Sequence, residues 1–343
     1  MAESTSSLSA ILDPVRSSSA SASPAPEADP FARILGRSAA LREAIARART
    51  VARVDSSVLI NGESGTGKEL IAKGIHESSL RARAPFVALN CATLAESLQG
   101  STLFGHAKGA FTGALRDQPG LFEAAHDGTL FLDEVAELAP SAQAALLRVL
   151  QEGVITRIGE HRERKVDVRL IAATHRDLDD AIQAGAFRTD LFFRLNVFSI
   201  TVPALRERDD DVLLLAQRFI EEYNLKMNRT LSGLSAEVSR LFLAYDWPGN
   251  VRELRNTVES AVLLARGDLI QIDDLPACLV KRLIEQDSRP TVRPETPPRR
   301  SDWKQRIVAA LTKTGGRRDQ AATLLGTSRT TLWRKMKELG LND

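Results

Sequence analysis

The segment Gly62–Lys68 constrains the fold of this chain more than any other part of the sequence. Its residues, Gly-Glu-Ser-Gly-Thr-Gly-Lys, fit the G-x4-G-K spacing of a phosphate-binding loop. The apolar run Val58–Ile60 precedes the loop, and a helical pattern opens at Lys68. Glycines let backbone N–H groups surround phosphate oxygens, and the helix N-terminus adds partial positive charge. This context predicts a nucleotide site, with an inert glycine-rich turn as the alternative.

Apolar runs alternate with helical patterns from Phe31 to about Gln286. This alternation predicts an α/β fold, a mostly parallel sheet flanked by helices. The expected strands are Val58–Ile60, Phe86–Leu89, Leu130–Leu132, Leu170–Ala172 and Phe198–Val202. Strand patterns stop after Val202, where helical patterns follow at Asp211–Tyr223, Ala236–Tyr245 and Val251–Ala265. We therefore expect a helical subdomain packed on the sheet.

The other domain boundaries follow from composition. Residues 1–30 are rich in Ser, Ala and Pro, with too little apolar surface to offset the entropy of ordering, so we expect a disordered leader. Residues 287–300 hold four prolines among charged residues, which favours an extended linker. The predicted order is leader (1–30), sheet subdomain (31–205), helical lid (206–286), linker (287–300) and a small all-α domain (301–343).

Charge is distributed unevenly, although the formal net charge is only +2. Residues 299–343 carry eleven Lys or Arg against four Asp or Glu, a net charge of +7, so the rest of the chain carries −5. The tail is therefore expected to meet a polyanion. Cys91 and Cys278 lie far apart and near no histidine cluster, which argues against a disulfide scaffold or a zinc site. With no membrane-length apolar run and no export signal, we expect a cytoplasmic protein.

An apolar run from Gly128 ends in two acids, Asp133 and Glu134. In an ATPase, this arrangement puts the first acid near magnesium and lets the second orient the attacking water. Acids that merely lie on the surface are the alternative. Glu69 stands where many phosphate loops place the Ser or Thr that binds magnesium, so the metal must depend on Asp133, on water or on Thr66.

The loop sequence that follows Lys108 identifies a family. It resembles the GAFTGA loop of the sigma-54-dependent, NtrC-type AAA+ transcription activators, and the resemblance extends from roughly Phe31 to Ala277. A loop with two glycines, no charge and one aromatic suits a mobile contact, and an inert insertion is the alternative. The resemblance implies that sigma-54 is contacted by Gly109, Ala110, Phe111, Thr112, Gly113 and Ala114.

The same resemblance implies several catalytic residues. Asn90 matches the family asparagine that restrains the catalytic glutamate, here Glu134. Arg188 and Arg194 match the arginine-finger segment, which reaches the γ-phosphate held by a neighbouring subunit and so requires a ring. The implied catalytic set is Glu134, Asp133, Asn90, Arg188 and Arg194, with Asp133 also holding magnesium through ATP.

Two sensor segments complete the implied nucleotide site. Trp247–Leu254 matches sensor II, with Arg252 contacting nucleotide from the lid, and Leu170–His175 resembles sensor I. Thr174 fits that pattern, but His175 occupies a position commonly held by asparagine, and its charge makes pH-sensitive turnover an open question. The expected ATP contacts are Gly62, Glu63, Ser64, Gly65, Thr66, Gly67, Lys68, Glu69, Thr174 and Arg252.

The basic tail resembles the Fis-type helix-turn-helix. Gly326 permits the tight turn and Ser328 caps the last helix, while apolar residues such as Ala321 and Leu332 close a three-helix core. A protein-binding bundle is the alternative. DNA contacts are expected from Ser328, Arg329, Thr330, Thr331, Arg334 and Lys335.

The resemblance as a whole implies a sigma-54-dependent activator that uses ATP and Mg²⁺. Its expected partners are sigma-54 RNA polymerase, upstream DNA and further copies of itself, as a hexamer. The family usually has an N-terminal receiver or sensing domain, which residues 1–30 are too short to form, so we expect control by a protein in trans or by abundance. The rival hypotheses are another AAA+ remodeller and a repressor that uses ATP only to assemble.

Overall fold

The computed structural model describes residues 29–111, 114–277, 279–281, 307–312, 314, 317–318, 320–321, 325, 332 and 336. The chain divides into two compact units, Met1–Val280 and Lys281–Asp343. The predicted leader up to residue 28 and the predicted linker at 287–300 lie outside the described residues.

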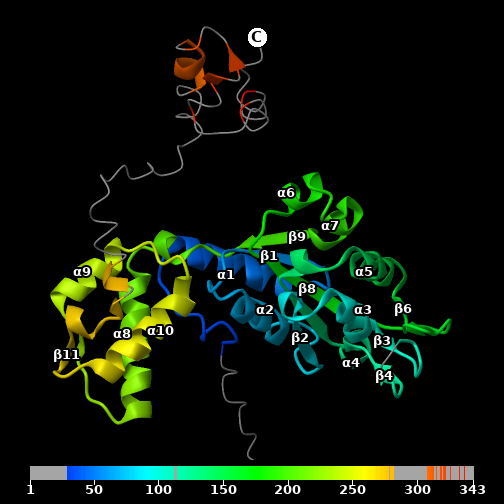
Figure 1. The fold of residues 1–343 in the computed structure, drawn as a ribbon, viewed down its shortest axis with the longest axis horizontal. Helices are drawn as coiled ribbons and strands as arrows, with labels where there is room; N and C mark the ends of the chain where they lie inside the picture. The colour runs from blue at the N-terminus through cyan, green and yellow to red at the C-terminus, as the bar shows by residue number, and fades with distance from the viewer. Residues whose placement is uncertain are drawn as a thin grey trace, which may run out of the picture. The chain divides into compact units, whose positions relative to one another are not determined.

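A five-stranded parallel sheet forms the centre of the first unit (Figure 1). Its strands are β1 (Val58–Asn61), β2 (Phe86–Asn90), β5 (Thr129–Asp133), β8 (Arg169–Thr174) and β9 (Phe198–Thr201). They lie in the order β2-β5-β8-β1-β9, and every neighbouring pair is parallel. All five predicted strands are confirmed. Parallel strands this buried need helices on both faces.

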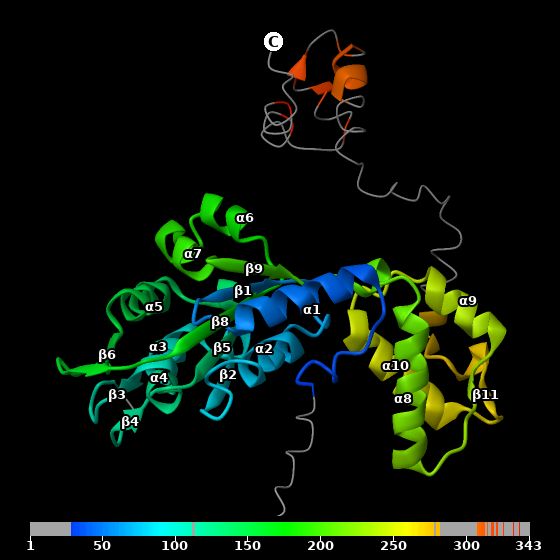
Figure 2. The ribbon, with the colours of Figure 1, turned by 180° about the vertical axis from the view of Figure 1, so that it is seen from behind.

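Alternate strand residues supply the two faces of the sheet. Ile60, Phe131 and Ile171 pack on one face with α1 (Ala39–Ala52) and α2 (Lys68–Glu77). Leu59, Leu130 and Leu170 pack on the other face. That second face is covered by α3 (Glu96–Phe104), α4 (Leu121–Ala124), α5 (Pro140–Glu152), α6 (Leu178–Gln183) and α7 (Thr189–Leu195). Figure 2 shows these helices from behind.

Short antiparallel hairpins project beyond the sheet, and the sequence patterns did not predict them. One pairs β3 (Gly105–His106) with β4 (Gln118–Pro119), and the other pairs β6 (Val154–Thr156) with β7 (Glu163–Lys165). Strands of two or three residues are too short to show a period of two, so no alternation marks them.

The predicted lid consists of α8 (Asp211–Met227), α9 (Ala236–Ala244) and α10 (Asn250–Leu264). Trp247 is buried between α9 and α10, where its indole N–H donates to the carbonyl of Phe242 at 2.9 Å. The expectation that strands stop after Val202 was wrong in one detail, because β10 (Gly233–Leu234) pairs with β11 (Leu269–Ile270). Among the described residues, 3-10 turns lie at Cys91–Thr93, Val135–Glu137, Leu205–Glu207 and Ile272–Asp274.

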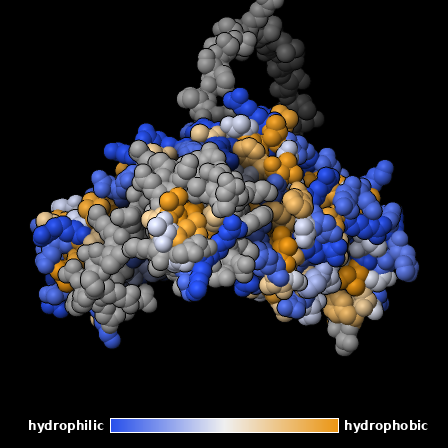
Figure 3. Space-filling model, turned by 90° about the horizontal axis from the view of Figure 1, so that it is seen from above, coloured by the Kyte–Doolittle hydropathy of each residue, from blue (hydrophilic) through white to orange (hydrophobic). Residues whose placement is uncertain are grey.

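Hydrophilic and apolar patches alternate on the face of the molecule shown in Figure 3. Across the residues that the structure describes, no helix has both the length and the apolar character needed to cross a membrane.

Cys91 is a free, buried thiol, and burial raises its pKa to about 12, so it is a core residue rather than a nucleophile.

Candidate active site

The phosphate loop lies at the carboxyl end of β1, where α2 begins at Lys68. Gly65 and Gly67 have φ angles of +80° and +99°, a region that glycine enters without steric cost. A cavity of about 520 Å³ opens beside the loop and is lined by Lys68, Asp133 and Arg252, among others. A helix N-terminus and a lysine facing such a cavity form a site for a polyanionic ligand.

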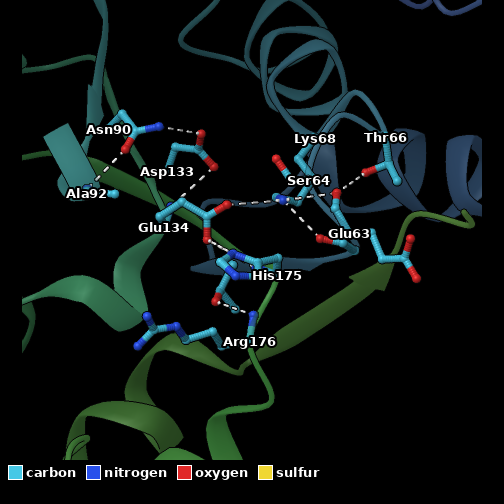
Figure 4. Close-up of polar contacts among 12 residues, drawn as sticks. Glu63, Ser64, Thr66, Lys68, Asn90, Ala92, Asp133, Glu134, His175 and Arg176 are labelled. Atoms are coloured by element: carbon cyan, nitrogen blue, oxygen red, sulfur yellow. Dashed lines mark hydrogen bonds and ion pairs between the residues drawn. The ribbon is translucent and has the colours of Figure 1, made fainter. Parts of the chain in front are cut away.

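Glu134 is held from two sides (Figure 4). Its side chain accepts hydrogen bonds from the backbone N–H of His175 at 3.2 Å and contacts His175 Nδ1 at 2.6 Å. Its other oxygen lies 3.5 Å from the ammonium of Lys68. Glu134 has a left-handed φ of +54° directly after β5, so the chain turns there and aims the carboxylate at the phosphate loop. The structure thus brings together Lys68, Glu134 and the sensor I segment.

The two neighbouring acids have opposite pKa shifts. Burial and the adjacent Glu134 charge raise the pKa of Asp133, although Lys68 opposes them. Burial alone would also raise the pKa of Glu134, but the hydrogen bond from His175 and the charge of Lys68 hold that pKa below its ordinary value. Glu134 is therefore a carboxylate at neutral pH, ready to accept a hydrogen bond from water.

The partner of Asn90 differs from the expected one. Asn90 was expected to restrain Glu134, but its amide donates to Asp133 at 3.1 Å, while its oxygen accepts from the N–H of Ala92. The register explains the contact, because Asn90 lies directly opposite Asp133 across β2 and β5. The restraint on Glu134 comes instead from His175.

Thr174 contacts the phosphate loop through its backbone rather than its side chain. Its carbonyl accepts from the N–H of Gly62 at 3.2 Å, whereas its hydroxyl accepts from Arg176. It lines a separate cavity of about 380 Å³ with His175 and Asn61. The histidine that replaces the usual asparagine therefore makes the closer sensor contact.

The side chains present fit a Mg²⁺–nucleotide complex better than a metal site made of protein alone. No three His, Cys, Asp or Glu side chains within the described residues cluster tightly enough to hold a metal. The Thr66 hydroxyl donates to the carbonyl of Glu63 at 2.8 Å, and Glu69 pairs with Lys73 at 2.7 Å. Asp133 lines the cavity beside Glu134, and Mg²⁺ readily takes one carboxylate together with phosphates and water.

The lid reaches the phosphate loop through residues that sequence analysis only partly identified. Arg252 donates to the hydroxyl of Ser64 at 3.0 Å and lines the cavity, while its contact with nucleotide stays a prediction. Sequence analysis missed Arg206, which forms a two-bond ion pair with Glu63, and Asn250, which donates to both Glu63 and Ser64. Asn250 lies in the same segment as Arg252, so that segment could have pointed to it.

The two candidate finger arginines lie away from the phosphate loop of their own chain. Arg188 precedes α7 and pairs with Asp190 at 2.7 Å. Arg194 lies in the last turn of α7 and donates to the carbonyl of Leu150 at 2.8 Å. Both are exposed. Neither lines the cavity beside Lys68.

The loop predicted to contact sigma-54 projects from the β3–β4 hairpin. Phe111 is 40% exposed, and its ring meets the ring of His106 edge-on at 4.9 Å. Gly109 and Ala114 close the base of the loop with a backbone hydrogen bond of 2.9 Å, and Ala110 lies against Gly159. Thr112 and Gly113 lie outside the described residues.

The second unit has a small apolar core of Ile307, Ala310, Ala321, Leu332 and Met336. Two of the residues predicted for that core, Ala321 and Leu332, are confirmed as buried. The predicted DNA contacts Ser328, Arg329, Thr330, Thr331, Arg334 and Lys335 are all among the residues that the structure does not describe.

Three families match successive parts of the chain. The sigma-54 interaction domain matches residues 34–201, the AAA+ ATPase lid domain matches residues 206–291, and the Fis family of bacterial regulatory proteins matches residues 304–339. The three matches follow one another without overlap and include both compact units.

Curated relatives match over most of the chain. The transcriptional regulatory protein ZraR of Escherichia coli K12 is 46% identical over 307 residues, covering 88% of this chain and 68% of ZraR. The regulatory protein AtoC of the same strain is 43% identical over 313 residues, covering 90% of this chain and 68% of AtoC. Among solved structures, NtrX from Brucella abortus in complex with ATP superposes with a TM-score of 0.69 at 34% identity, covering 90% of this chain and 69% of NtrX.

Proposed function

Because the chain belongs to the sigma-54-dependent AAA+ transcription activators, we propose that ATP hydrolysed between its subunits moves the loop at residues 109–114 against sigma-54. The chain is an AAA+ ATPase with a sigma-54 interaction domain and a Fis-type DNA-binding domain. The observation that carries the proposal is the meeting of Lys68, Asp133 and Glu134 at one cavity in such a chain.

Three residues of one chain would act directly on ATP. Lys68, already at the helix N-terminus, would bind the terminal phosphates. Asp133 would hold Mg²⁺, which supplies charge stabilisation to the phosphates when bound. Glu134 would orient the attacking water as a carboxylate, after its contact with His175 yields to that water. The ATP bound by NtrX supports this assignment.

The remaining catalytic charge would come from a second subunit. Arg188 and Arg194 are exposed and do not line the cavity of their own chain, so we propose that they reach the γ-phosphate of a neighbouring chain in a ring, expected to be a hexamer. An arginine supplied in trans is worth about 10³–10⁵ in turnover.

Coupling to transcription would use two further regions. The loop centred on Phe111 and Thr112 would engage sigma-54, and the basic tail with Arg329, Arg334 and Lys335 would hold the ring at upstream DNA. Since the proposed partners are promoter DNA and RNA polymerase, we also propose a cytoplasmic location.

The test is open-complex formation on a sigma-54 promoter. It uses the full chain, core polymerase, sigma-54 and ATP, with sigma-70 holoenzyme as the comparison. We expect opening that requires both sigma-54 and hydrolysis. ATP hydrolysis without any opening would contradict the proposal and favour a remodeller with a different target.

Thr112→Ala separates the loop from the ATPase. We expect complete loss of promoter opening but basal ATP hydrolysis within about twofold of the unaltered protein, because the proposed contact of Thr112 is with sigma-54 and not with ATP. Thr50→Ala, an exposed threonine on α1, is the control. If Thr112→Ala instead lost ATP hydrolysis but still opened the promoter to the extent that its remaining hydrolysis allowed, the assignment of Thr112 to sigma-54 contact would be contradicted.

A further inference from the structure

Every carbonyl oxygen from Gly62 to Thr66 already accepts a hydrogen bond. Those of Gly62 and Glu63 accept from the ammonium of Lys68, at 2.9 and 3.3 Å. The next three accept from residues beyond the sheet: Ser64 from Asn250 at 3.1 Å, Gly65 from the N–H of Val251 at 3.0 Å, and Thr66 from Arg208 at 2.7 Å. The carbonyls of Ser64, Gly65 and Thr66 are thus held from the lid side by an outer layer of Asn250, Val251 and Arg208. Those of Gly62 and Glu63 are held by Lys68, which lines the cavity.

Asn250 is the centre of this outer layer. It is fully buried, and its amide nitrogen donates both to the carbonyl of Ser64 and to the carboxylate of Glu63, at 3.1 and 3.0 Å. Its amide oxygen accepts from the N–H of Leu205 at 2.8 Å. One side chain thus joins the phosphate loop, the segment entering the lid and the first residue of α10. Its φ of +51° suits asparagine, which enters the left-handed region more readily than most residues.

The loop and the lid are in close contact at Gly65. A Cβ at Gly65 would lie 2.4 Å from the carbonyl oxygen of Gly249, the residue before Asn250. Arg208, only 2% exposed, fixes Thr66 beside this contact, and burial lowers its pKa to about 10, still far above neutrality. Because Gly65 and Gly249 are closely packed, a displacement of the lid also displaces the side of the phosphate loop that touches it.

We propose that Asn250 is a positioning residue for ATP hydrolysis, which ties the phosphate loop to the lid through Ser64 and Glu63. Binding of the triphosphate then sets the position of α10, and the position of α10 sets the loop. The guanidinium of Arg252 donates to the exposed hydroxyl of Ser64, a side chain, rather than to a carbonyl of the loop. Departure of the buried Asn250 would instead break its hydrogen bonds to the Ser64 carbonyl, the Glu63 carboxylate and the Leu205 N–H. The proposal rests on the nucleotide site of the proposed function and not on sigma-54.

The experiment measures affinity for a fluorescent ATP analogue and kcat in the full-length chain. Asn250→Asp removes both donated hydrogen bonds and places a second carboxylate beside Glu63. We expect ATP affinity to fall about tenfold or more, with a lower kcat. Asn228→Asp is the matched control, because Asn228 has the same φ of +51° but is exposed at the end of α8. It should bind and hydrolyse ATP normally.

A double variant distinguishes positioning from a general packing defect. In Asn250→Asp combined with Glu63→Gln, a glutamine amide at position 63 can donate to the new carboxylate, so ATP affinity should recover to within about threefold of Glu63→Gln alone. Normal ATP affinity in Asn250→Asp, or additive losses in the double variant, would overturn the inference. Failure of the unaltered chain to bind ATP would instead overturn the proposed function, and this inference with it.

A second pair of substitutions covers the case in which Asn250→Asp fails to fold. Glu63→Ala removes the Asn250 and Arg206 contacts together, whereas Arg206→Gln removes only the exposed ion pair. We expect Glu63→Ala to weaken ATP binding severalfold more than Arg206→Gln does. Equal effects would show that the Asn250 contact adds nothing.

Discussion

The two halves of the proposed catalytic site are built in opposite ways. Lys68 and Glu134 are only 6% and 8% exposed, and they contact each other and His175 across long sequence separations. Arg188 and Arg194 are exposed, and their guanidinium groups bond to an aspartate two residues away and to a backbone carbonyl of α5, respectively. The buried half is assembled within one chain, whereas we propose that the exposed half acts only against a docked neighbour.

The difference follows from the cost of burying charge. A buried carboxylate or ammonium must be paired and hydrogen-bonded, so Lys68 and Glu134 are fixed before ATP arrives. An exposed arginine keeps its hydration, and its surface ion pair is worth only about 0–1 kcal/mol. Arg188 and Arg194 can therefore exchange their present contacts for a phosphate at little cost.

The largest expected effect tests whether the exposed half acts in trans. Arg194→Ala should lower ATP turnover about 10³-fold or more, while Arg148→Ala, another exposed arginine, should not. Mixing Arg194→Ala with Glu134→Gln subunits should restore turnover, because intact Glu134 and intact Arg194 then meet at some interfaces. If the mixed subunits assembled into a ring but stayed inactive, Arg194 would not act on the ATP of a neighbouring subunit.

The next effect tests the buried half. Glu134→Gln keeps the shape of the side chain but removes the carboxylate, so kcat should fall about 10²–10⁴-fold while ATP still binds. Glu137→Gln is the control, because Glu137 lies in the 3-10 turn just after Glu134 but pairs with Arg176 at 2.6 Å. Near-normal turnover by Glu134→Gln would remove this residue from the mechanism.

A smaller effect concerns pH. The hydrogen bond from His175 lowers the pKa of Glu134, so His175→Phe should raise that pKa. A base is lost as pH falls through its pKa, and the acid limb of the kcat profile should therefore move to higher pH. His161→Phe, a change at an exposed histidine, should leave the profile in place. An unmoved acid limb in both variants would show that the contact does not tune Glu134.

The smallest effect tests how loosely the exposed half is held. Asp190→Asn removes the ion pair of Arg188, and because such pairs are weak, steady-state ATP turnover should change less than about threefold. A loss as large as that of Arg188→Ala would mean that Asp190 positions the arginine, and the two halves would then be more alike than their exposure indicates.

Sequence patterns predicted the parts of the fold that are long or buried. All five sheet strands were predicted as apolar runs, and the three lid helices were predicted from their helical periodicity. The two-residue pairs β3–β4 and β10–β11 were missed because they are too short to show a pattern.

Contacts between distant segments limited the prediction of the site. The roles of Lys68 and Asp133 follow from local spacing, and the structure places both at one cavity. The pairing of Asn90 with Asp133 depends on strand register, which no single segment encodes. The contact of Glu63 with Asn250 spans 187 residues, and only the folded chain reveals it.

The place of β8 in the sheet has a mechanical consequence. This strand is buried along its whole length between β5 and β1, and His175 follows its last residue. Three residues separate its first residue from the β6–β7 hairpin, where Ile158 is bonded to the backbone of Gly105 and Ala107 below the loop. Close-packed interiors have low compressibility. A displacement of His175 by Glu134 is therefore transmitted along the stiff strand β8. The other end of β8 leads to the hairpin that contacts the base of the loop at residues 109–114, so the backbone path from Glu134 to that loop is short.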